Sequence, residues 1–482
     1  MFMHVACIKI SKMKLQKIIL ENYRCFEKLE LSLQASEKEA RETSLYDNLT
    51  VLVAANGHGK TAILEAIKYL LGVFISRLGR SAPKPRKTDF RQVWSSRQQD
   101  FFGNHNYSTQ KAPFMRITGV ADFDSRNVKW DMTSKRDNSA KTQAEIPQAI
   151  GTKEIHSIAD SFLDNYNQKI DLLLPIIAYF GTERAVIRSV PQRTRGFQKN
   201  FEPFDAFVEA LDGNLNYRKL IEWMFSLDYE QLKKRDKTKQ YDYVSIEHDT
   251  IQLAIERMLP GFSNLRIERE KNEPLDLYVD IEENGTFKTC SIDSQLSDGY
   301  KIVLVLVLNL VSRILEANGN YPGITAEKLL ECQGVVLIDE VELHLHPSWQ
   351  QRIIPDLLRT FPNIQFIVST HSPQVISSVP KECVRIINDA QLVPFETKTN
   401  GAKAEQVLNE IFGVESRSPE SEVTKAFNEY YSLIQKNEWD TERGKELQRY
   451  LAEQLSTDPD FISLATEIHI KDYQRRHMHE KD

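Results

Sequence analysis

Short, mainly apolar runs are the clearest pattern in this chain. They occupy residues 49–53, 172–180, 335–338 and 364–369. A strand that is buried on both faces, as in a parallel sheet, has this pattern. We therefore predict an α/β fold built on a parallel sheet that is covered on both sides.

A second class of strand alternates apolar and polar positions. Residues 13–33 predict two strands joined by a turn at 22–26, and residues 115–132 predict a hairpin. Such alternation is typical of antiparallel strands with one solvated face. We expect an antiparallel β lobe beside the main sheet, and a return to strands at residues 265–281.

Helical spacing of apolar residues connects these strands. It predicts helices at residues 61–73, 297–316 and 349–358, a helical stretch over 204–260, and helices again after residue 415. Residues 80–112 are polar and are predicted to be a loop or the surface of a lobe, and residues 133–155 are predicted to be a loop. The predicted organisation is an N-terminal extension (1–12), the first half of the main domain with the β lobe (13–200), a helical insertion (201–262), the second half (263–395) and a helical C-terminal partner-binding region (396–482).

The composition is that of a globular protein and gives no sign of a disulfide framework or a membrane span. A hydrophobic content of 41%, a charged content of 27% and a net charge of −6 are ordinary for a globular protein. Five scattered cysteines without a C-x-x-C pair fit a reducing compartment. The longest apolar run, 302–311, is about half of the roughly 20 residues that a membrane span needs. We expect a cytoplasmic protein with no membrane contact.

The strand at 49–53 leads into a phosphate-binding motif. Ala54-Ala55-Asn56-Gly57-His58-Gly59-Lys60-Thr61 matches G-x-x-x-x-G-K-[ST] except that Ala54 replaces the first glycine. Such a loop cradles phosphates with backbone N–H groups at a helix N-terminus. Lys60 would reach the β- and γ-phosphates of ATP, and the Thr61 hydroxyl would bind Mg²⁺.

The apolar run at 335–338 ends in two adjacent carboxylates, Asp339 and Glu340. Ligands of open α/β sheets bind outside the carboxyl ends of the strands. These carboxylates therefore emerge where a nucleotide and its magnesium could be held. The alternative is a core strand that ends in acidic loop residues.

Two further segments carry candidate residues. Leu296-Ser297-Asp298-Gly299-Tyr300 precedes the apolar helix, where Ser297 or Asp298 could act as an N-cap. The run at 364–369 leads into Thr370 and His371, and a histidine there could contact the γ-phosphate or the attacking water.

Together these segments resemble the ABC-type head ATPases of the RecF, SMC and OLD group, over residues 13–70 and 290–390. The run from Asp339 to Pro347 is similar to the Asp-Glu-Pro-Glu-x-His-Leu-His-Pro run of the OLD-like branch, with Val341 in place of proline. The resemblance implies an ABC-type P-loop ATPase head in which Asp339 coordinates Mg²⁺ and Glu340 polarises the attacking water. It also implies that Ser297 and Gly299 face the γ-phosphate held by a second subunit.

Other assignments depend on the same resemblance. The turn at Tyr23-Arg24-Cys25-Phe26 is similar to the Asn-[Phe/Tyr]-Arg-x-Phe element of the group, which implies that Arg24 lies near the nucleotide. Gln92 is a guess for the Q-loop glutamine. Residues 342–346 would form the loop that crosses to the partner subunit. A competing interpretation uses the histidines at 344, 346 and 371 as zinc ligands.

Two clusters of basic residues are candidate contacts for DNA. One contains Arg184, Arg188, Arg193, Arg195 and Lys199, and the other contains Lys84, Arg86, Lys87 and Arg91. Clustered lysine and arginine can contact nucleic-acid phosphates, but such clusters are also common on solvated surfaces.

The C-terminal region shows no strand-borne Asp-x-Asp of a Toprim nuclease, and Asp458-Pro459-Asp460 lies between predicted helices. A head with a short helical tail resembles the PtuA family of Septu-type anti-phage systems. That resemblance implies a homodimer or higher oligomer that works with an HNH nuclease subunit similar to PtuB, and in some retron systems with a reverse transcriptase and its msDNA. Two alternatives are a RecF-like repair ATPase that binds DNA directly and a scaffold with low ATP turnover.

Overall fold

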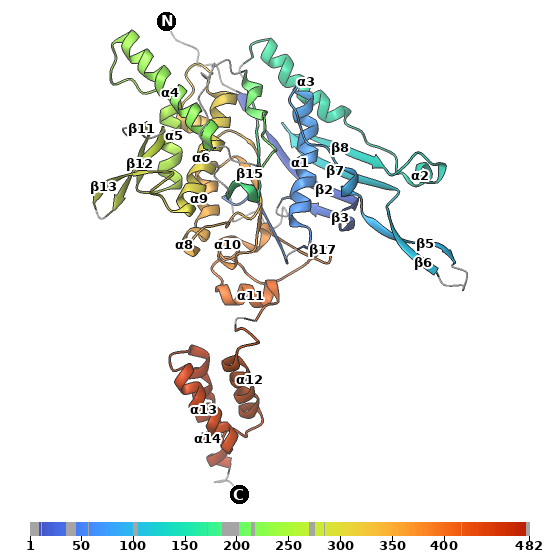
Figure 1. The fold of residues 1–482 in the computed structure, drawn as a ribbon, viewed down its shortest axis with the longest axis vertical. Coiled ribbons are helices and arrows are strands. Elements are labelled where there is room, and N and C mark those ends of the chain that lie inside the picture. Colours follow the sequence, from blue (N-terminus) through green and yellow to red (C-terminus); the bar gives the residue numbers. More distant parts are fainter. Residues whose placement is uncertain are drawn as a thin grey trace. The chain divides into compact units, whose positions relative to one another are not determined.

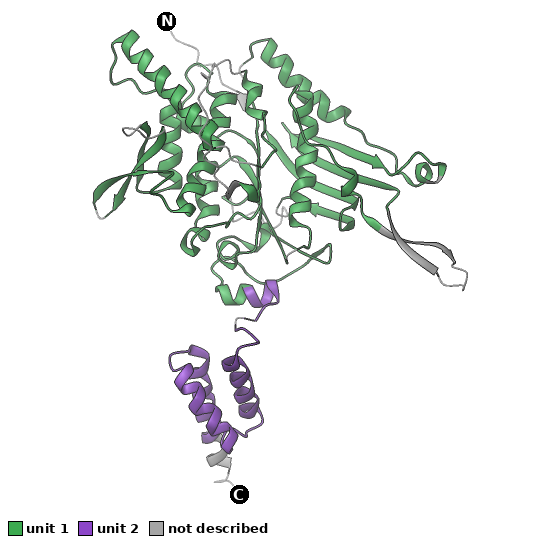
Figure 2. Ribbon diagram, viewed as in Figure 1, with its two compact units in different colours: residues 1–407 green, residues 408–482 purple. Residues whose placement is uncertain are grey.

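The computed structural model describes residues 9–10, 12–34, 45–55, 57–99, 105–170, 172–185, 202–213, 217–268, 275–283, 285–415 and 417–478. The chain divides into two compact units, residues 1–407 and residues 408–482 (Figure 2). We call them the head and the C-terminal unit.

A six-stranded sheet forms the centre of the head (Figure 1). Five strands run parallel, and the edge strand β17 is antiparallel to β16. The order across the sheet is β10 (Ile176–Phe180), β14 (Gly334–Ile338), β15 (Ile364–Thr370), β4 (Leu49–Ala54), β16 (Val384–Asn388) and β17 (Gln391–Val393). The first four contain the four apolar runs, so the prediction of a buried parallel sheet is confirmed.

The register brings the carboxyl ends of three strands to one edge. Ile338 of β14 pairs with Val368 of β15, and Thr370 of β15 pairs with Val53 of β4. The residues that follow β4, β14 and β15 are therefore neighbours in space although they lie far apart in sequence. The candidate site is at this edge.

The predicted antiparallel lobe is also confirmed. Its strand order is β3 (Phe26–Ser32), β2 (Met13–Tyr23), β7 (Phe114–Phe123) and β8 (Arg126–Lys135). The helix α1 (Lys60–Arg77) packs against it, because the indole N–H of the fully buried Trp130 donates to the Leu70 carbonyl at 3.2 Å. The lobe thus holds the helix that follows β4.

On the other side of the sheet, α5 (Ile246–Met258) packs against α6 (Asp298–Asn318), α7 (Ala326–Leu330) and α9 (Ile353–Thr360). Beside them lie α4 (Tyr217–Thr238) and a three-stranded sheet of β11 (Phe262–Glu268), β12 (Asp276–Glu283) and β13 (Thr286–Ser291) (Figure 1). The boundaries 201–262 and 263–395 remain predictions.

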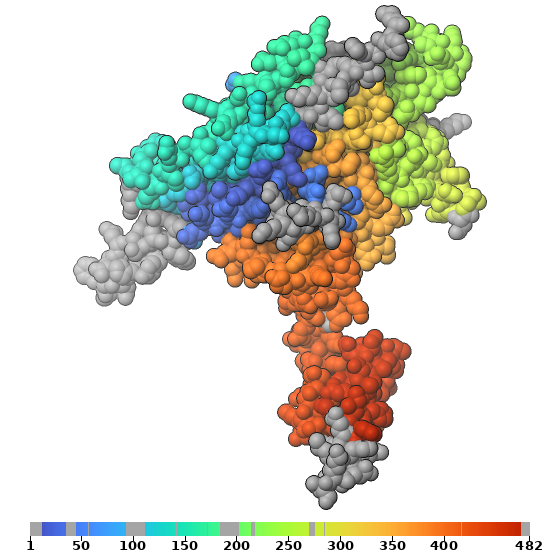
Figure 3. All heavy atoms as spheres, turned by 180° about the vertical axis from the view of Figure 1, so that it is seen from behind, coloured from blue at the N-terminus to red at the C-terminus, as the bar shows by residue number. Residues whose placement is uncertain are grey.

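The two halves of the head interlock. β16 pairs with β4, and β17 contacts β3, so residues near 390 lie on the first fifty residues of the chain. Figure 3 shows this contact as orange residues against blue ones.

The loop predicted at residues 133–155 is wrong, and residues 80–112, predicted to be a loop or a lobe surface, contain regular elements. Residues 80–112 contain a short 3-10 helix, Lys87–Asp89, and an antiparallel ribbon of β5 (Gln92–Gln99) and β6 (His105–Lys111). Residues 133–155 contain the end of β8, α2 (Ala140–Glu145) and the start of α3 (Lys153–Asn167). Both segments carry few large apolar residues, so their hydrophobic pattern gave no signal; α2 instead begins at a capping serine, Ser139.

Prolines divide two other predicted elements. The strand predicted at 172–180 is β9 (Leu172–Leu173) and β10, with Pro175 between them. The helix predicted at 349–358 is α8 (Pro347–Gln350) followed by α9, which has Pro355 in its first turn. A proline has no backbone N–H to donate, so it is accommodated at the first turn of a helix or outside a strand.

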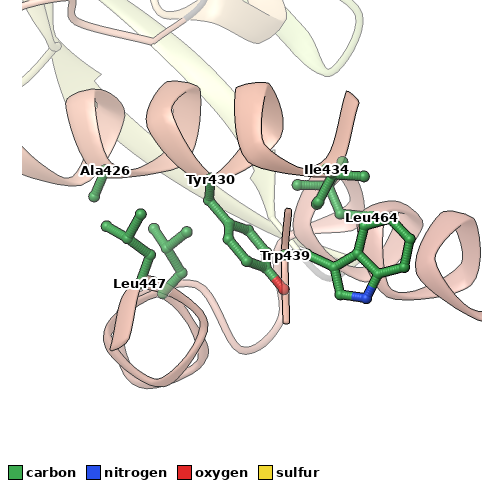
Figure 4. Packing of buried hydrophobic residues seen from close by; sticks show 7 residues of the cluster. Ala426, Tyr430, Ile434, Trp439, Leu447 and Leu464 are labelled. Carbon is green, nitrogen blue, oxygen red and sulfur yellow. The ribbon is translucent and has the colours of Figure 1, made fainter. Parts of the chain in front are cut away.

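The C-terminal unit has its own core. Three helices, α12 (Glu422–Gln435), α13 (Glu442–Gln454) and α14 (Pro459–Met478), enclose seven buried side chains (Figure 4): Ala426, Tyr430, Ile434, Trp439, Leu447, Leu451 and Leu464. The helices predicted after residue 415 are therefore confirmed. No helix in the described part of the chain has both the length and the apolarity of a membrane span.

Removing a large side chain from this core should unfold the C-terminal unit first. Leu451 is fully buried, so Leu451→Ala should destabilise the unit by about 2–5 kcal/mol. Hydrogen exchange on the full chain should show faster exchange in α12, α13 and α14 and unchanged protection in β4, β14 and β15.

The control is Glu453→Ala, an exposed position on the same helix. It should leave exchange in all three helices as in the wild type. Equal acceleration in the central sheet of the Leu451→Ala variant would contradict the division into two independently packed units.

Candidate functional site

The loop between β4 and α1 has the backbone geometry of a phosphate cradle. Gly57 and Gly59 have φ values of 80° and 99°, and Gly59 is the N-cap of α1. Left-handed backbone of this kind favours glycine. Gly59 is also crowded, because an added Cβ would lie 2.5 Å from the Phe26 ring and 2.9 Å from the Cys25 sulfur. Only glycine fits this position.

Lys60, the first residue of α1, is buried at 6% exposure. Its ammonium donates to the Ala54 carbonyl at 2.7 Å and is 3.4 Å from that of Ala55. Burial lowers the pKa of Lys60, and the negative charges of Asp339, Glu340 and Glu342 oppose that shift. Lys60 therefore lies within the electrostatic reach of three carboxylates.

Asp339 and Glu340 are held by one hydroxyl. The carboxylate of Asp339, at 2% exposure, accepts a hydrogen bond from Ser369. The same serine oxygen accepts the Glu340 N–H at 2.8 Å. Glu340 has a left-handed φ of 48°, a conformation uncommon for residues other than glycine. Ser369 thus fixes the point where the chain turns out of β14.

Glu342 and His371 join the same group. The His371 N–H donates to Oε1 of Glu342, and Oε2 of Glu342 is buried without a hydrogen-bond partner in the described part of the chain. Burial, followed by the charge of Lys60, lowers the pKa of His371 against the opposing carboxylates. The lowered pKa favours the neutral imidazole.

Four of the predicted residues lie together at the edge of the sheet: Lys60, Asp339, Glu340 and His371. The other predicted residues of the phosphate loop flank Lys60. Thr61 is the exposed second residue of α1. The ring nitrogen Nδ1 of His58 accepts the Asp389 N–H at 3.3 Å, which ties the loop to the β16–β17 turn. Asn56 lies outside the described residues. Thr61 and Asp339 offer the hard oxygen ligands that Mg²⁺ prefers.

Arg24 lies in the turn between β2 and β3, next to Cys25 and Phe26, whose side chains pack against Gly59 of the phosphate loop. Its guanidinium pairs with Asp89 at 2.9 Å and with Glu65. It lines a hollow of about 540 Å³ together with Gln92, the residue guessed for the Q-loop. The two side chains thus share a hollow beside the phosphate loop.

Ser297 and Gly299 lie in a different hollow, of about 660 Å³. Its lining comes from residues 297–300 and from residues 344–349, and it includes neither Lys60 nor His371. Ser297 is the N-cap of α6, but its hydroxyl accepts no capping hydrogen bond from the helix. An added Cβ at Gly299 would lie 3.2 Å from the His344 carbonyl, so the helix end packs tightly on that loop.

The three histidines that the zinc interpretation would use as ligands do not lie at one site. His344 and His346 line the second hollow, and Nδ1 of His346 accepts the Ser348 N–H at 3.3 Å as the cap of α8. His371 belongs to the Lys60 group. The described residues contain no group of three or more side chains that could hold a metal ion by themselves.

Two residues that sequence reasoning missed hold the site in shape. One is Ser369, and the other is Gln350 of α8. Gln350 donates to the Leu345 carbonyl at 2.8 Å and accepts from the Ser372 hydroxyl at 2.6 Å. A polar residue at the end of an apolar run was the one available signal for Ser369.

DNA contact by the two basic clusters stays a prediction. Lys84, Arg86 and Lys87 are exposed, while Arg91 pairs with Glu27 at 2.9 Å. The side chains of the other cluster, at 184, 188, 193, 195 and 199, lie outside the described residues.

Comparison with known proteins gives relatives for nearly the whole chain. It is 28% identical over 499 residues to a retron Ec83 probable ATPase of Escherichia coli, which covers 95% of this chain and 87% of the relative. It is 26% identical to a retron Vc95 probable ATPase of Vibrio cholerae, covering 92% and 87%. A Septu protein PtuA of Bacillus mycoides is 26% identical over 53% of this chain and 30% of its own length.

Among solved structures, the SMC head domain from Thermotoga maritima aligns with 80% of this chain and all of its own, at 14% identity and a TM-score of 0.40. The recombination mediator protein RecF bound to ATP aligns with 80% of this chain and all of its own, at 14% identity and a TM-score of 0.39.

Residues 49–377 match the family model described as "AAA domain, putative AbiEii toxin, Type IV TA system". This range begins at β4 and ends just after α10 (Pro373–Ile376), so it contains the phosphate loop, the acidic strand end and the histidine turn. The chain therefore belongs to this AAA-domain family, and its relatives include retron ATPases and Septu PtuA proteins.

Proposed function

We propose that this protein binds and hydrolyses ATP with Mg²⁺, and that two heads close on each other around the nucleotide. We further propose that closure regulates a partner HNH nuclease in anti-phage defence in the cytoplasm. The observation that carries the first part is the grouping of Lys60, Asp339, Glu340 and His371 at one edge of the sheet.

The phosphate loop supplies the binding half of this mechanism. Free backbone N–H groups at the start of α1 suit an anion, and Lys60 adds a positive charge. In the structure the Lys60 ammonium hydrogen-bonds to carbonyls of its own loop, which holds it in place before phosphates arrive. Bound Mg²⁺ would neutralise phosphate charge, with Thr61 and Asp339 as its protein ligands.

The catalytic half rests on Glu340 and His371. Glu340 follows the carboxyl end of β14, and its carboxylate can accept a proton from an attacking water. The lowered pKa of His371 favours its neutral form, whose ring N–H can donate to a γ-phosphate oxygen without adding a full charge. Catalysis of phosphoryl transfer is mostly positioning and charge stabilisation.

A second subunit is needed because Ser297 and Gly299 line a separate hollow. The uncapped hydroxyl of Ser297 and the start of α6 suit an anion. In the proposed dimer, this surface receives the γ-phosphate held at Lys60 of the other subunit. Hydrolysis then opens the dimer, which makes ATP a timer for the partner nuclease.

The relatives support the biological part of the proposal. Two of them are named retron ATPases and another is named Septu PtuA. The HNH nuclease, and a reverse transcriptase with msDNA, come to this chain only through that likeness.

Lys60→Ala should abolish ATP binding. The change removes the positive charge that the loop directs at the phosphates, and it leaves three carboxylates unopposed. Binding of a fluorescent ATP analogue to the full chain measures it. Lys28→Ala, at an exposed position of β3, is the control and should bind normally. Wild-type affinity in Lys60→Ala would refute the phosphate-loop assignment.

Glu340→Gln should bind ATP normally and turn it over about 10²–10⁴-fold more slowly, because an amide cannot take the proton of the attacking water. Size-exclusion chromatography with ATP should show an accumulated dimer. The exposed change Glu282→Gln on β12 is the control. Turnover at the wild-type rate in Glu340→Gln would show that another group is the base.

Ser369→Ala should raise the Mg²⁺ concentration that turnover requires. The variant removes a hydrogen bond to the Asp339 carboxylate, an interaction of about 1.5–3 kcal/mol for a charged group. Turnover measured against Mg²⁺ concentration detects the shift. Ser312→Ala, whose hydroxyl bonds only within α6, should leave the curve in place. An unchanged curve in Ser369→Ala would show that this hydrogen bond does not set the magnesium affinity of Asp339.

The rival functions predict other results. A RecF-like ATPase would bind DNA as an isolated chain, with an affinity that falls steeply with salt. A scaffold would bind ATP with almost no turnover, and the replacements at Ala54, Asp298 and Val341 favour it because each departs from the commoner motif.

A further inference from the structure

Gln350 connects two segments that the proposed function treats separately. One is the loop of residues 342–346, which follows the acidic strand end. The other is the turn of residues 370–373, which carries His371. The Gln350 amide donates to the Leu345 carbonyl at 2.8 Å, and its oxygen accepts the Ser372 hydroxyl at 2.6 Å. One side chain thus bonds to both segments at once.

The same two segments are joined a second time. Oε1 of Glu342 accepts the backbone N–H of His371. The loop is therefore tied to the histidine turn near its start, through Glu342, and near its end, through Leu345 and Gln350. Ser372 is buried at 5% exposure and also accepts the N–H groups of Gln374 and Val375, so its hydroxyl is fixed in place.

On its other side the loop contacts the start of α6. The His344 carbonyl lies so near Gly299 that an added Cβ would be 3.2 Å from it. His344 and Leu345 line the hollow at Ser297. A displacement of the loop would therefore change the shape of that hollow.

We infer that Gln350 is a positioning residue that couples the His371 turn to the loop of residues 342–346, so that nucleotide bound at Lys60 sets the shape of the hollow at Ser297. The inference rests on the proposed function, in which His371 contacts the γ-phosphate and the hollow receives the nucleotide of the other subunit. The side-chain hydrogen bonds of Gln350 go to the loop and to the turn, so it acts through the two segments that it joins.

Gln350→Leu tests the coupling, because leucine has a similar size and makes neither hydrogen bond. In the full chain we expect unchanged binding of the ATP analogue and an unchanged KM for ATP. We expect kcat to fall about ten- to hundredfold, as for a misplaced catalytic group. Purely local destabilisation would not separate kcat from KM in this way.

Two comparisons make the result specific. Gln351→Leu changes the neighbouring, exposed glutamine, and it should keep wild-type kcat. Ser372→Ala removes the other partner of the shared hydrogen bond. The fall in kcat for the Gln350→Leu/Ser372→Ala double variant should be smaller than the product of the two single falls, because both changes break one interaction.

Three outcomes would overturn the inference: wild-type kcat in Gln350→Leu, equal losses in Gln350→Leu and Gln351→Leu, or fully multiplicative losses in the double variant. Glu340→Gln, assayed in parallel, keeps this failure distinct from failure of the proposed function. If Glu340→Gln stops turnover and Gln350→Leu does not, the ATPase assignment stands and the coupling is wrong.

Discussion

The register between β14 and β15 is the constraint on which the candidate site depends. Ile338 pairs with Val368, so Asp339, which follows β14, lies beside Ser369, the next residue of β15. The Ser369 hydroxyl then bonds to the Asp339 carboxylate and to the backbone of Glu340. A slip of one residue would turn every side chain of the strand to the opposite face and separate these groups.

Charge balance imposes a second constraint at the same edge. Lys60 is buried among carboxylates, and a buried ion is costly when its partners are removed. Packing around Gly59 by Phe26 and Cys25 keeps the loop closed around Lys60. The antiparallel lobe, which provides these two residues, is therefore part of the site as well as of the fold.

Much of this could be predicted from the sequence, for physical reasons. Buried parallel strands must be apolar on both faces, so the run at 335–338 identified β14, and the rule for strand ends placed Asp339 beside the phosphate loop. The ribbon at 92–111 could not be predicted, because its polar strands give no periodic signal. Nor could the roles of Ser369 and Gln350, whose hydrogen bonds join residues brought together only by the folded register. The catalytic and ligand roles of the predicted residues remain predictions.

The separate core of the C-terminal unit has an evolutionary consequence. Because Tyr430, Leu451 and the other core residues pack together within residues 426–464, mutations there act first on the packing of this unit. A lineage could therefore exchange or remodel these helices by recombination without re-optimising the head. We expect sequence divergence among relatives to be concentrated in this unit, while the head changes slowly.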